Sequence, residues 1–443
     1  MRFAWRAWLH ALLCVVIAVC LAALSARFGF TTDWSAGARA TIAPQAQALL
    51  KQLNGPLQVT GYARPGKLRA KTSLLVARYR RFKPNLTLKF VDPDLDPVAT
   101  QDANITLDGE LVLRWNGRIQ HVTRLDDRDF SDALVRLTRG GTKQVAFITG
   151  SGERDATGKN AADLDDFVMQ LSALGVRALP LNLAEAAEVP RNADLVVLAS
   201  PQAALLPTSV TKLEAYVADG GNLLWLTEPG SDELGLAPLA QALGIKRLPG
   251  TLLDARSPGA GTGDPRRLVT TQYPPQAITD GFQLNVLFPR AEALAALSGA
   301  AWNAQPILQS GASSWNQTAP IDPAGAAFDQ DSNALKGPLT FGYALSRLSP
   351  SPARNQQRVV VIGDGDFISN AYLADAGNLA FGERVFDWLL GDDALAGMPR
   401  SAPDAVLKPT RAELGALTFG YLIALPIILV LIGLTISWRR RRR

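Results

Sequence analysis

Cysteine and histidine are almost absent from this chain of 443 residues. The only cysteines, Cys14 and Cys20, lie in one apolar run near the N-terminus, so their number excludes a disulfide framework and a cysteine-based zinc site. The two histidines are His10, in the same run, and His121, in a predicted strand. From so few residues we assemble no Ser-His-Asp or Cys-His catalytic set. We therefore predict no catalytic residues, no bound metal and no cofactor.

A strongly charged folded surface is missing as well. The 45 basic and 40 acidic residues give a net charge of +5, but Arg2, Arg6 and the five terminal arginines, Arg439 to Arg443, account for the excess. Without these seven, 38 basic residues stand against 40 acidic ones. Nucleic-acid binding needs basic residues clustered on the folded part of a protein. We therefore predict no nucleic-acid partner.

Two uncharged, apolar segments bracket the chain, at residues 7–26 and 414–437. A helix needs about 20 apolar residues to cross a bilayer, so we predict a transmembrane helix in each segment. The arginine tail 438–443 follows the second segment and, by the positive-inside rule, lies in the cytoplasm. These features predict a bacterial inner-membrane protein that contacts membrane lipid, with both termini cytoplasmic and a large periplasmic domain.

The first apolar segment has an alternative interpretation as a cleaved signal peptide. Arg2 and Arg6 precede it, and Ala23-Leu24-Ser25 fits a cleavage site of small residues. The segment is longer than the usual hydrophobic region of a signal peptide, about 7–15 residues, which favours a retained anchor. Either alternative leaves the middle of the chain outside the cytoplasm.

Residues 30–140 have the pattern of a thioredoxin-like α/β module. Strands at 57–63 and from residue 86 alternate with helices, and Asn116-Gly117 predicts a tight hairpin between two further strands. A helix at 129–140 then ends at two glycines. The module has no CxxC pair for redox chemistry, so we interpret it as a scaffold.

Residues 143–395 predict a second α/β module, with a doubly wound parallel sheet. Its predicted strands are continuous apolar runs that alternate with helices, which is typical of parallel strands buried on both faces. The strands fall at residues 143–149, 194–201, 222–229 and 357–362. Residues 250–335 are rich in Gly, Pro and polar residues, and we expect irregular insertions there, with a strand or two near residues 344–348.

Polar residues follow several of these strands, at the carboxyl edge where parallel sheets bind ligands. We expect them to line one crevice. The candidate ligand-binding residues are Ser151, Gly152, Glu153, Arg154, Glu228, Asp364, Asp366 and Asn370.

The pair Asp364-Gly365-Asp366 has two interpretations. Its carboxylates are suitable oxygen ligands for a divalent cation. Asp and Gly are also ordinary turn and cap residues at the end of a strand, and the pattern favours this second role.

The segment Gly152–Asn160 contains glycine and lysine but departs from a nucleotide-binding P-loop, G-x-x-x-x-G-K-[ST]. One residue too many separates Gly152 from Gly158, and Asn160 stands where a Ser or Thr would bind magnesium. We therefore expect no ATP site in this chain.

Three stretches together resemble the GldG-like proteins, auxiliary components of ABC-type transport systems related to the gliding-motility transporter. They are "LKFVDPDLDPVAT", "KQVAFITGSGERDA" with "GGNLLWLTEP", and "RVVVIGDGDFISNAYL". The resemblance implies a non-catalytic partner of a separate permease and ATPase. It also implies a central module similar to the class I glutamine amidotransferase-like fold and to a domain of intraflagellar transport proteins.

The chain departs from this family at Gly150-Ser151-Gly152-Glu153, where the family commonly has Gly-His-Gly-Glu. Amidotransferase chemistry needs a cysteine nucleophile, and the second module contains none. We therefore expect a membrane-anchored auxiliary or substrate-binding component of an ABC transport system. The alternatives are a structural envelope scaffold, or a hydrolase that uses Glu153, Asp364 and Asp366 with a metal.

Overall fold

The computed structural model describes residues 42, 44–139, 141–230, 233–256, 264–318, 334–352 and 355–392, all within the compact unit Met1–Ser401. The predicted transmembrane segments 7–26 and 414–437 and the arginine tail 438–443 lie outside the described residues. Each helix that the described ranges contain is too short or too polar to cross a membrane.

The N-terminal module contains a four-stranded sheet with the strand order β2-β1-β3-β4. Strands β1 and β2 are parallel, whereas β3 runs antiparallel to both of its neighbours, β1 and β4. The elements are α2 (Pro44–Gln52), β1 (Leu57–Tyr62), α3 (Lys67–Arg80), β2 (Leu86–Val91), α4 (Pro97–Asp102), β3 (Glu110–Trp115), β4 (Arg118–Val122) and α5 (Asp127–Arg139). This order is compatible with the thioredoxin-like prediction, to which the structure adds the short helix α4 between β2 and β3.

The predicted hairpin between β3 and β4 is confirmed. Asn116 and Gly117 form its two-residue loop, with φ angles of 47° and 76°. A type I′ turn requires positive φ at both positions, which asparagine tolerates and glycine adopts freely.

Alternating side chains divide the N-terminal sheet into two unequal faces. Leu57 and Val59 of β1, with Leu111 of β3, pack against α2, α3 and α5 in the main core of the module. Tyr62 and Val112 point to the opposite face, where the small cluster around Ala103 covers them. The period of two along each strand produces this division.

The second module is built on a seven-stranded mixed sheet with the order β14-β16-β17-β8-β7-β5-β6. Five strands, from β17 to β6, are parallel, as the apolar runs predicted, but β14 and β16 at one edge are antiparallel. The elements of this sheet and its helices are β5 (Lys143–Thr149), α6 (Asp165–Ala173), β6 (Val176–Asn182), β7 (Leu195–Ala199), α7 (Pro207–Ala218), β8 (Leu223–Leu226), α8 (Ala237–Leu243), β14 (Asn303–Gln309), β16 (Thr340–Leu348), β17 (Gln356–Ile362) and α9 (Asn378–Leu389). The prediction of a wholly parallel sheet is therefore wrong at the edge formed by β14 and β16.

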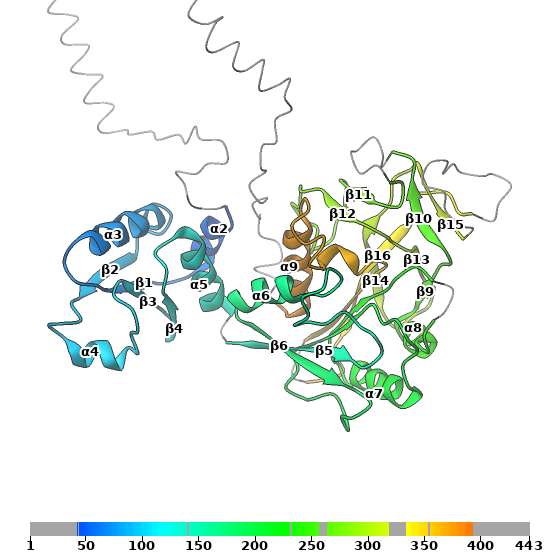
Figure 1. The fold of residues 1–443 in the computed structure, drawn as a ribbon, viewed down its shortest axis with the longest axis horizontal. Coiled ribbons are helices and arrows are strands. Elements are labelled where there is room, and N and C mark those ends of the chain that lie inside the picture. The colour runs from blue at the N-terminus through cyan, green and yellow to red at the C-terminus, as the bar shows by residue number, and fades with distance from the viewer. Residues whose placement is uncertain are drawn as a thin grey trace, which may run out of the picture. The chain divides into compact units, whose positions relative to one another are not determined.

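Both faces of this sheet are buried. Val145 and Phe147 of β5 pack with α6 and α9 on one face, whereas Ala146 and Ile148 pack with α7 and α8 on the other. Figure 1 shows α6 and α9 on one side of β5 and α7 on the other. Burial on two faces explains why the sequence of these strands is continuously apolar rather than alternating.

The region predicted as irregular insertions, residues 250–335, contains β14 of the main sheet and most strands of three short antiparallel ribbons. These ribbons pair β9 (Ile245–Arg247) with β13 (Leu294–Ala296), β10 (Thr251–Asp254) with β15 (Ser314–Gln317), and β11 (Leu268–Thr270) with β12 (Val286–Phe288).

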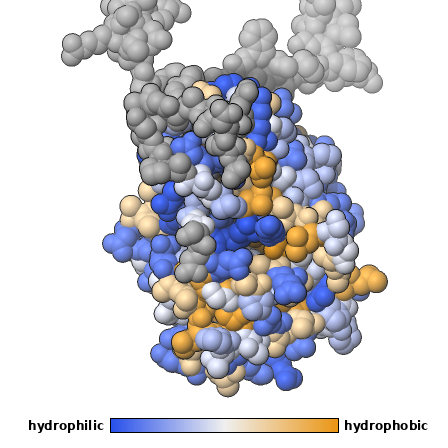
Figure 2. Space-filling model, turned by 90° about the vertical axis from the view of Figure 1, so that its right-hand side faces the viewer, coloured by the Kyte–Doolittle hydropathy of each residue, from blue (hydrophilic) through white to orange (hydrophobic). Residues whose placement is uncertain are grey.

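On the face that Figure 2 shows, hydrophobic residues lie in small patches between hydrophilic ones.

Asp132 of α5 provides a test of the packing of this helix. Burial raises the pKa of Asp132 to about 6, although the charges of Arg128 and Arg136 act in the opposite direction. The protonated form is therefore favoured in the folded state, and the stability it contributes is present below pH 4 and lost as the pH rises through about 6. The full effect is at most about 3 kcal/mol.

We predict that Asp132→Asn abolishes this fall in the free energy of unfolding between about pH 4 and 6. The measurement is unfolding of the full-length protein in detergent across this pH range, with the exposed Asp219→Asn as the matched control. An Asp132→Asn profile that parallels the wild type would contradict the half-buried position of Asp132.

Candidate functional site

The carboxyl ends of β5 and β7 lie side by side, although β6 separates these strands in the sequence. Strand order reverses at this point, and doubly wound sheets bind ligands in the crevice that such a reversal creates. Here the two loops bind each other. The amide of Gln202 donates to the carbonyl of Ser151 over 2.9 Å, and the amide of Arg154 donates to the carbonyl of Ala199 over 2.9 Å.

The Arg154 side chain joins the loops after β5, β8 and β17. Its Nη2 lies 2.7 Å from Glu228 Oε1 and 2.7 Å from Asp366 Oδ1, and its Nη1 donates to the carbonyl of Ala162 over 2.7 Å. The side chain is only 7% exposed. Burial acts to lower the pKa of Arg154, but the charges of Glu228 and Asp366 outweigh it and raise the pKa. The guanidinium therefore remains charged inside the fold.

Glu228 is the second centre of this arrangement, which we call the Arg154 cluster: Arg154, Ser200, Glu228, Arg290 and Asp366. Glu228 Oε1 also accepts hydrogen bonds from Ser200 Oγ, at 2.9 Å, and from the amide of Gly365, at 3.2 Å. Its other oxygen lies 3.3 Å from Nη2 of the half-exposed Arg290. Both oxygens of Glu228 are thus occupied by groups from other loops.

Asp364 is fully buried, and two backbone amides donate hydrogen bonds to its carboxyl group. Its Oδ2 accepts from the amide of Arg290 at 2.8 Å, and its Oδ1 accepts from the amide of Phe367 at 3.2 Å. Burial, together with the charges of Glu228 and Asp366, raises its pKa well above the ordinary value. Asp364 therefore shapes the turn that leads from β17 into the short helix η2 (Asp366–Ile368), as a cap residue does.

The remaining predicted residues, Ser151, Gly152, Glu153 and Asn370, do not belong to the Arg154 cluster. Glu153 accepts from the amide of Ser151 at 2.7 Å, while its Oε1 is buried without a partner in the described structure. The neighbouring Gly152 is exposed and has a φ of 77°. Asn370 instead donates to the carbonyls of Gly158 and Asn160 and accepts from the amide of Asp166, so it fixes a different loop.

The structure adds an ion pair that the sequence did not indicate. Glu292 is fully buried and pairs with Arg247 of β9, whose Nε lies 2.7 Å from its Oε1. Burial raises the pKa of Glu292, although Arg247 acts against this rise. Arg247 also donates to the carbonyl of Glu228 over 2.7 Å, which places this pair beside the Arg154 cluster. Both residues lie outside any motif, so no sequence signal marks them.

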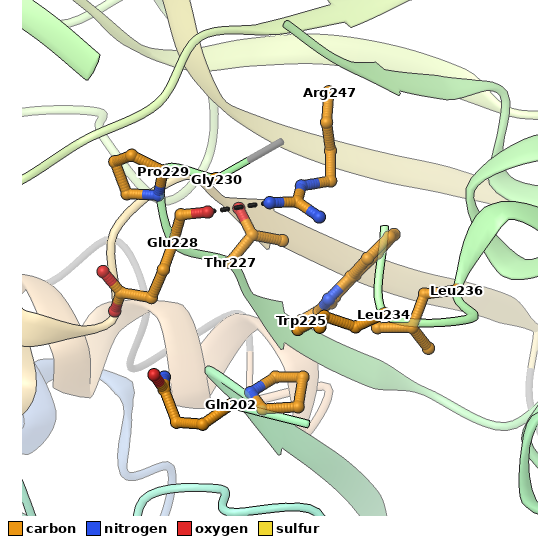
Figure 3. Close-up of a pocket in the computed structure, with 10 residues that line it drawn as sticks. Gln202, Trp225, Thr227, Glu228, Pro229, Gly230, Leu234, Leu236 and Arg247 are labelled. Atoms are coloured by element: carbon orange, nitrogen blue, oxygen red, sulfur yellow. Dashed lines mark hydrogen bonds between the residues drawn. The ribbon is translucent and has the colours of Figure 1, made fainter. Parts of the chain in front are cut away.

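A cavity of about 170 Å³ lies next to Glu228. Figure 3 shows Arg247 pointing toward the backbone of Glu228, with Trp225, Leu234 and Leu236 on the apolar side of the cavity. This volume is below the roughly 300–1,000 Å³ of typical ligand pockets. Across the described ranges, no three His, Cys, Asp or Glu side chains are grouped so that they could hold a metal ion.

The chain matches a protein-family model described as "ABC-type uncharacterized transport system" over residues 142–390, more than half of its length. It therefore belongs to this family, which indicates an auxiliary component of an ABC-type transport system. The family match covers the module that carries the Arg154 cluster.

Solved structures give weaker similarities. The mmIFT52 N-terminal domain is 17% identical, with a TM-score of 0.42 and coverage of 56% of this chain and 97% of that chain. Mitochondrial thioredoxin 3 from Saccharomyces cerevisiae is 16% identical, with a TM-score of 0.17 and coverage of 20% and 83%. The exo-β-1,4-mannosidase Op5Man5 from Opitutaceae bacterium strain TAV5 is 11% identical, with a TM-score of 0.29 and coverage of 76% and 51%. No curated protein matches the chain.

A substitution at Gly365 tests how closely the side chains of the Arg154 cluster pack at the carboxyl edge of the sheet. Its φ of −102° suits any residue, so only space decides a substitution. An added Cβ would overlap Ser200 Oγ and lie 3.1 Å from Arg154 Nε. We predict that Gly365→Ala lowers the free energy of unfolding of the full-length protein by about 1–3 kcal/mol.

The matched control is Gly230→Ala in the loop after β8, where the nearest atom to an added Cβ, the Glu228 carbonyl oxygen, is 4.0 Å away. We expect a change within about 0.5 kcal/mol for this variant in the same chemical unfolding measurement. Equal effects of the two substitutions would show that the edge is open at Gly365.

Proposed function

We propose that this protein is a membrane-anchored, non-catalytic component of an ABC-type transport system, of the GldG-like kind, with its folded body in the periplasm. The family match over residues 142–390 carries this proposal. The uncharged segments 7–26 and 414–437 support anchoring at both ends, and the arginines of the tail support a cytoplasmic C-terminus. The proposal includes an amidotransferase-like fold for the second module.

The contacts of the Arg154 cluster support a role in binding or assembly rather than a reaction. Arg154 holds Glu228 and Asp366, and Asp364 accepts two backbone amides, so these charged groups are engaged within the fold. General acid–base catalysis requires a side chain within reach of a substrate proton. We expect a small polar ligand, where one binds, to occupy the small cavity beside Glu228.

The energy for transport would come from a separate ATPase, because the segment Gly152–Asn160 does not have the pattern of a P-loop. The predicted partners are therefore the ATPase and the permease of the same system, with the terminal segments docking in the membrane. A structural scaffold of the envelope is the alternative, and it shares the anchors but not these partners.

Affinity purification of the tagged full-length protein from solubilised membranes, followed by mass spectrometry, tests this proposal. We predict that an ABC permease and an ATPase co-purify, and that neither follows an unrelated inner-membrane protein with the same tag. Recovery of neither subunit with this chain would reject the transport assignment in favour of a scaffold.

A further inference from the structure

In the N-terminal module, residues 92–110 run from the end of β2 to the first residue of β3 and form an excursion, which packs on the less covered face of the sheet. Figure 1 shows its helix α4 on the opposite side of the strands from α3. Ala103 and Ile105 of the excursion contact Tyr62 and Val112, which belong to β1 and β3. One side of the excursion thus forms a small core with the sheet.

Specific polar contacts fix the two ends of this excursion. The buried Glu110 accepts hydrogen bonds from the amides of Thr106 and Leu107, at 2.9 and 3.3 Å. Its Oε1 also lies 2.6 Å from Nδ1 of His121. At the other end Asp96 accepts from the amide of Ala99 at 3.0 Å and so caps α4. The excursion is therefore a defined surface.

The outer side of the excursion exposes large hydrophobic residues. Leu95 is 85% exposed, Val98 is 67% exposed and Leu107 is 53% exposed. Arg64 joins the residues that neighbour Leu95 and Leu107 in the sequence, because its guanidinium contacts the carboxylates of Asp94, at 2.7 Å, and Asp108, at 3.3 Å. Three such residues within one short, fixed segment are a candidate interaction surface.

The charge around these residues selects the partner. Residues 92–110 contain six acidic residues and no lysine or arginine. Asp92, Asp94 and Asp108 pair with Arg64 or Arg69 of the loop and helix that follow β1, while Asp96 and Asp102 are exposed on the excursion itself. Anionic lipid headgroups would be repelled by such a surface, whereas lysine and arginine side chains would be attracted.

We propose that Leu95, Val98 and Leu107 form a docking surface for a polypeptide that presents apolar side chains bordered by lysine or arginine. In identifying this polypeptide as a subunit of the transport system, the inference rests on the proposed function. An apolar centre with a charged rim is the ordinary anatomy of a protein–protein interface. The acidic rim supplies orientation and the three apolar side chains supply the buried contact.

Site-specific photo-crosslinking in membranes tests this surface. A benzophenone amino acid replaces Leu95 or Val98 in the tagged full-length protein, which is expressed together with its transport system. We expect crosslinks to a subunit of that system at both positions, at a yield at least about tenfold above the control position, Leu348. Leu348 is 89% exposed and belongs to β16 of the second module.

The reversal Asp102→Lys, combined with the Leu95 crosslinker, tests the charge argument. We expect this reversal to reduce the crosslinking yield several-fold. The control reversal Asp219→Lys, at the C-terminal end of α7, leaves the yield unchanged. Equal yields at Leu95, Val98 and Leu348, adducts with lipid alone, or indifference to Asp102→Lys would overturn the proposed surface.

Co-purification in the same samples separates this inference from the function on which it rests. If the permease or ATPase co-purifies but gives no crosslink from Leu95 or Val98, the docking surface is wrong and the transport role stands. If neither subunit co-purifies, the transport role fails and the surface loses its stated partner.

Discussion

The buried guanidinium of Arg154 is the constraint on which the second module depends. It lies in the loop after β5 and contacts carboxylates from the loops after β8 and β17, so one side chain fixes three connections of a parallel sheet. A buried ion cluster is not by itself a strong source of stability, because each charge loses its hydration. Its value is in specificity: removal of Arg154 would leave the partly buried Glu228 and Asp366 without their common partner, which the fold tolerates poorly.

The two modules use their strand ends differently. In the second module the loops at the carboxyl edge bind one another, through Arg154 and through the amides of Gln202 and Arg154, so the edge where related sheets hold ligands is largely closed. In the N-terminal module the segment after β2 extends outward and exposes Leu95 and Val98 between carboxylates. The closed edge of one module and the exposed apolar residues of the other fit the proposed role of a component that binds other subunits of a transport system.

Sequence reasoning succeeded where local chemistry determines the structure. The turn at Asn116-Gly117 and the apolar strands of the parallel sheet follow from turn geometry and burial on two faces. It failed where contacts between distant segments determine the structure. Strands β14 and β16 join the edge of the sheet as antiparallel strands, and Arg247 contacts Glu292, 45 residues away in the sequence. At the candidate site, Arg154, Glu228 and Asp366 do meet, across the 212 residues between Arg154 and Asp366, whereas Asn370 fixes a separate loop. A ligand-binding role for these residues stays a prediction.

A double-mutant cycle between Arg154→Ala and Glu228→Ala measures the central contact directly. The free energy of unfolding of the full-length protein is determined for the wild type, both single variants and the double variant. A cluster that holds the carboxyl edge together predicts a coupling energy of about 1–3 kcal/mol, with the double variant less damaged than the sum of the single variants. Effects that add to within about 0.5 kcal/mol would show that Arg154 and Glu228 act independently and would contradict the account.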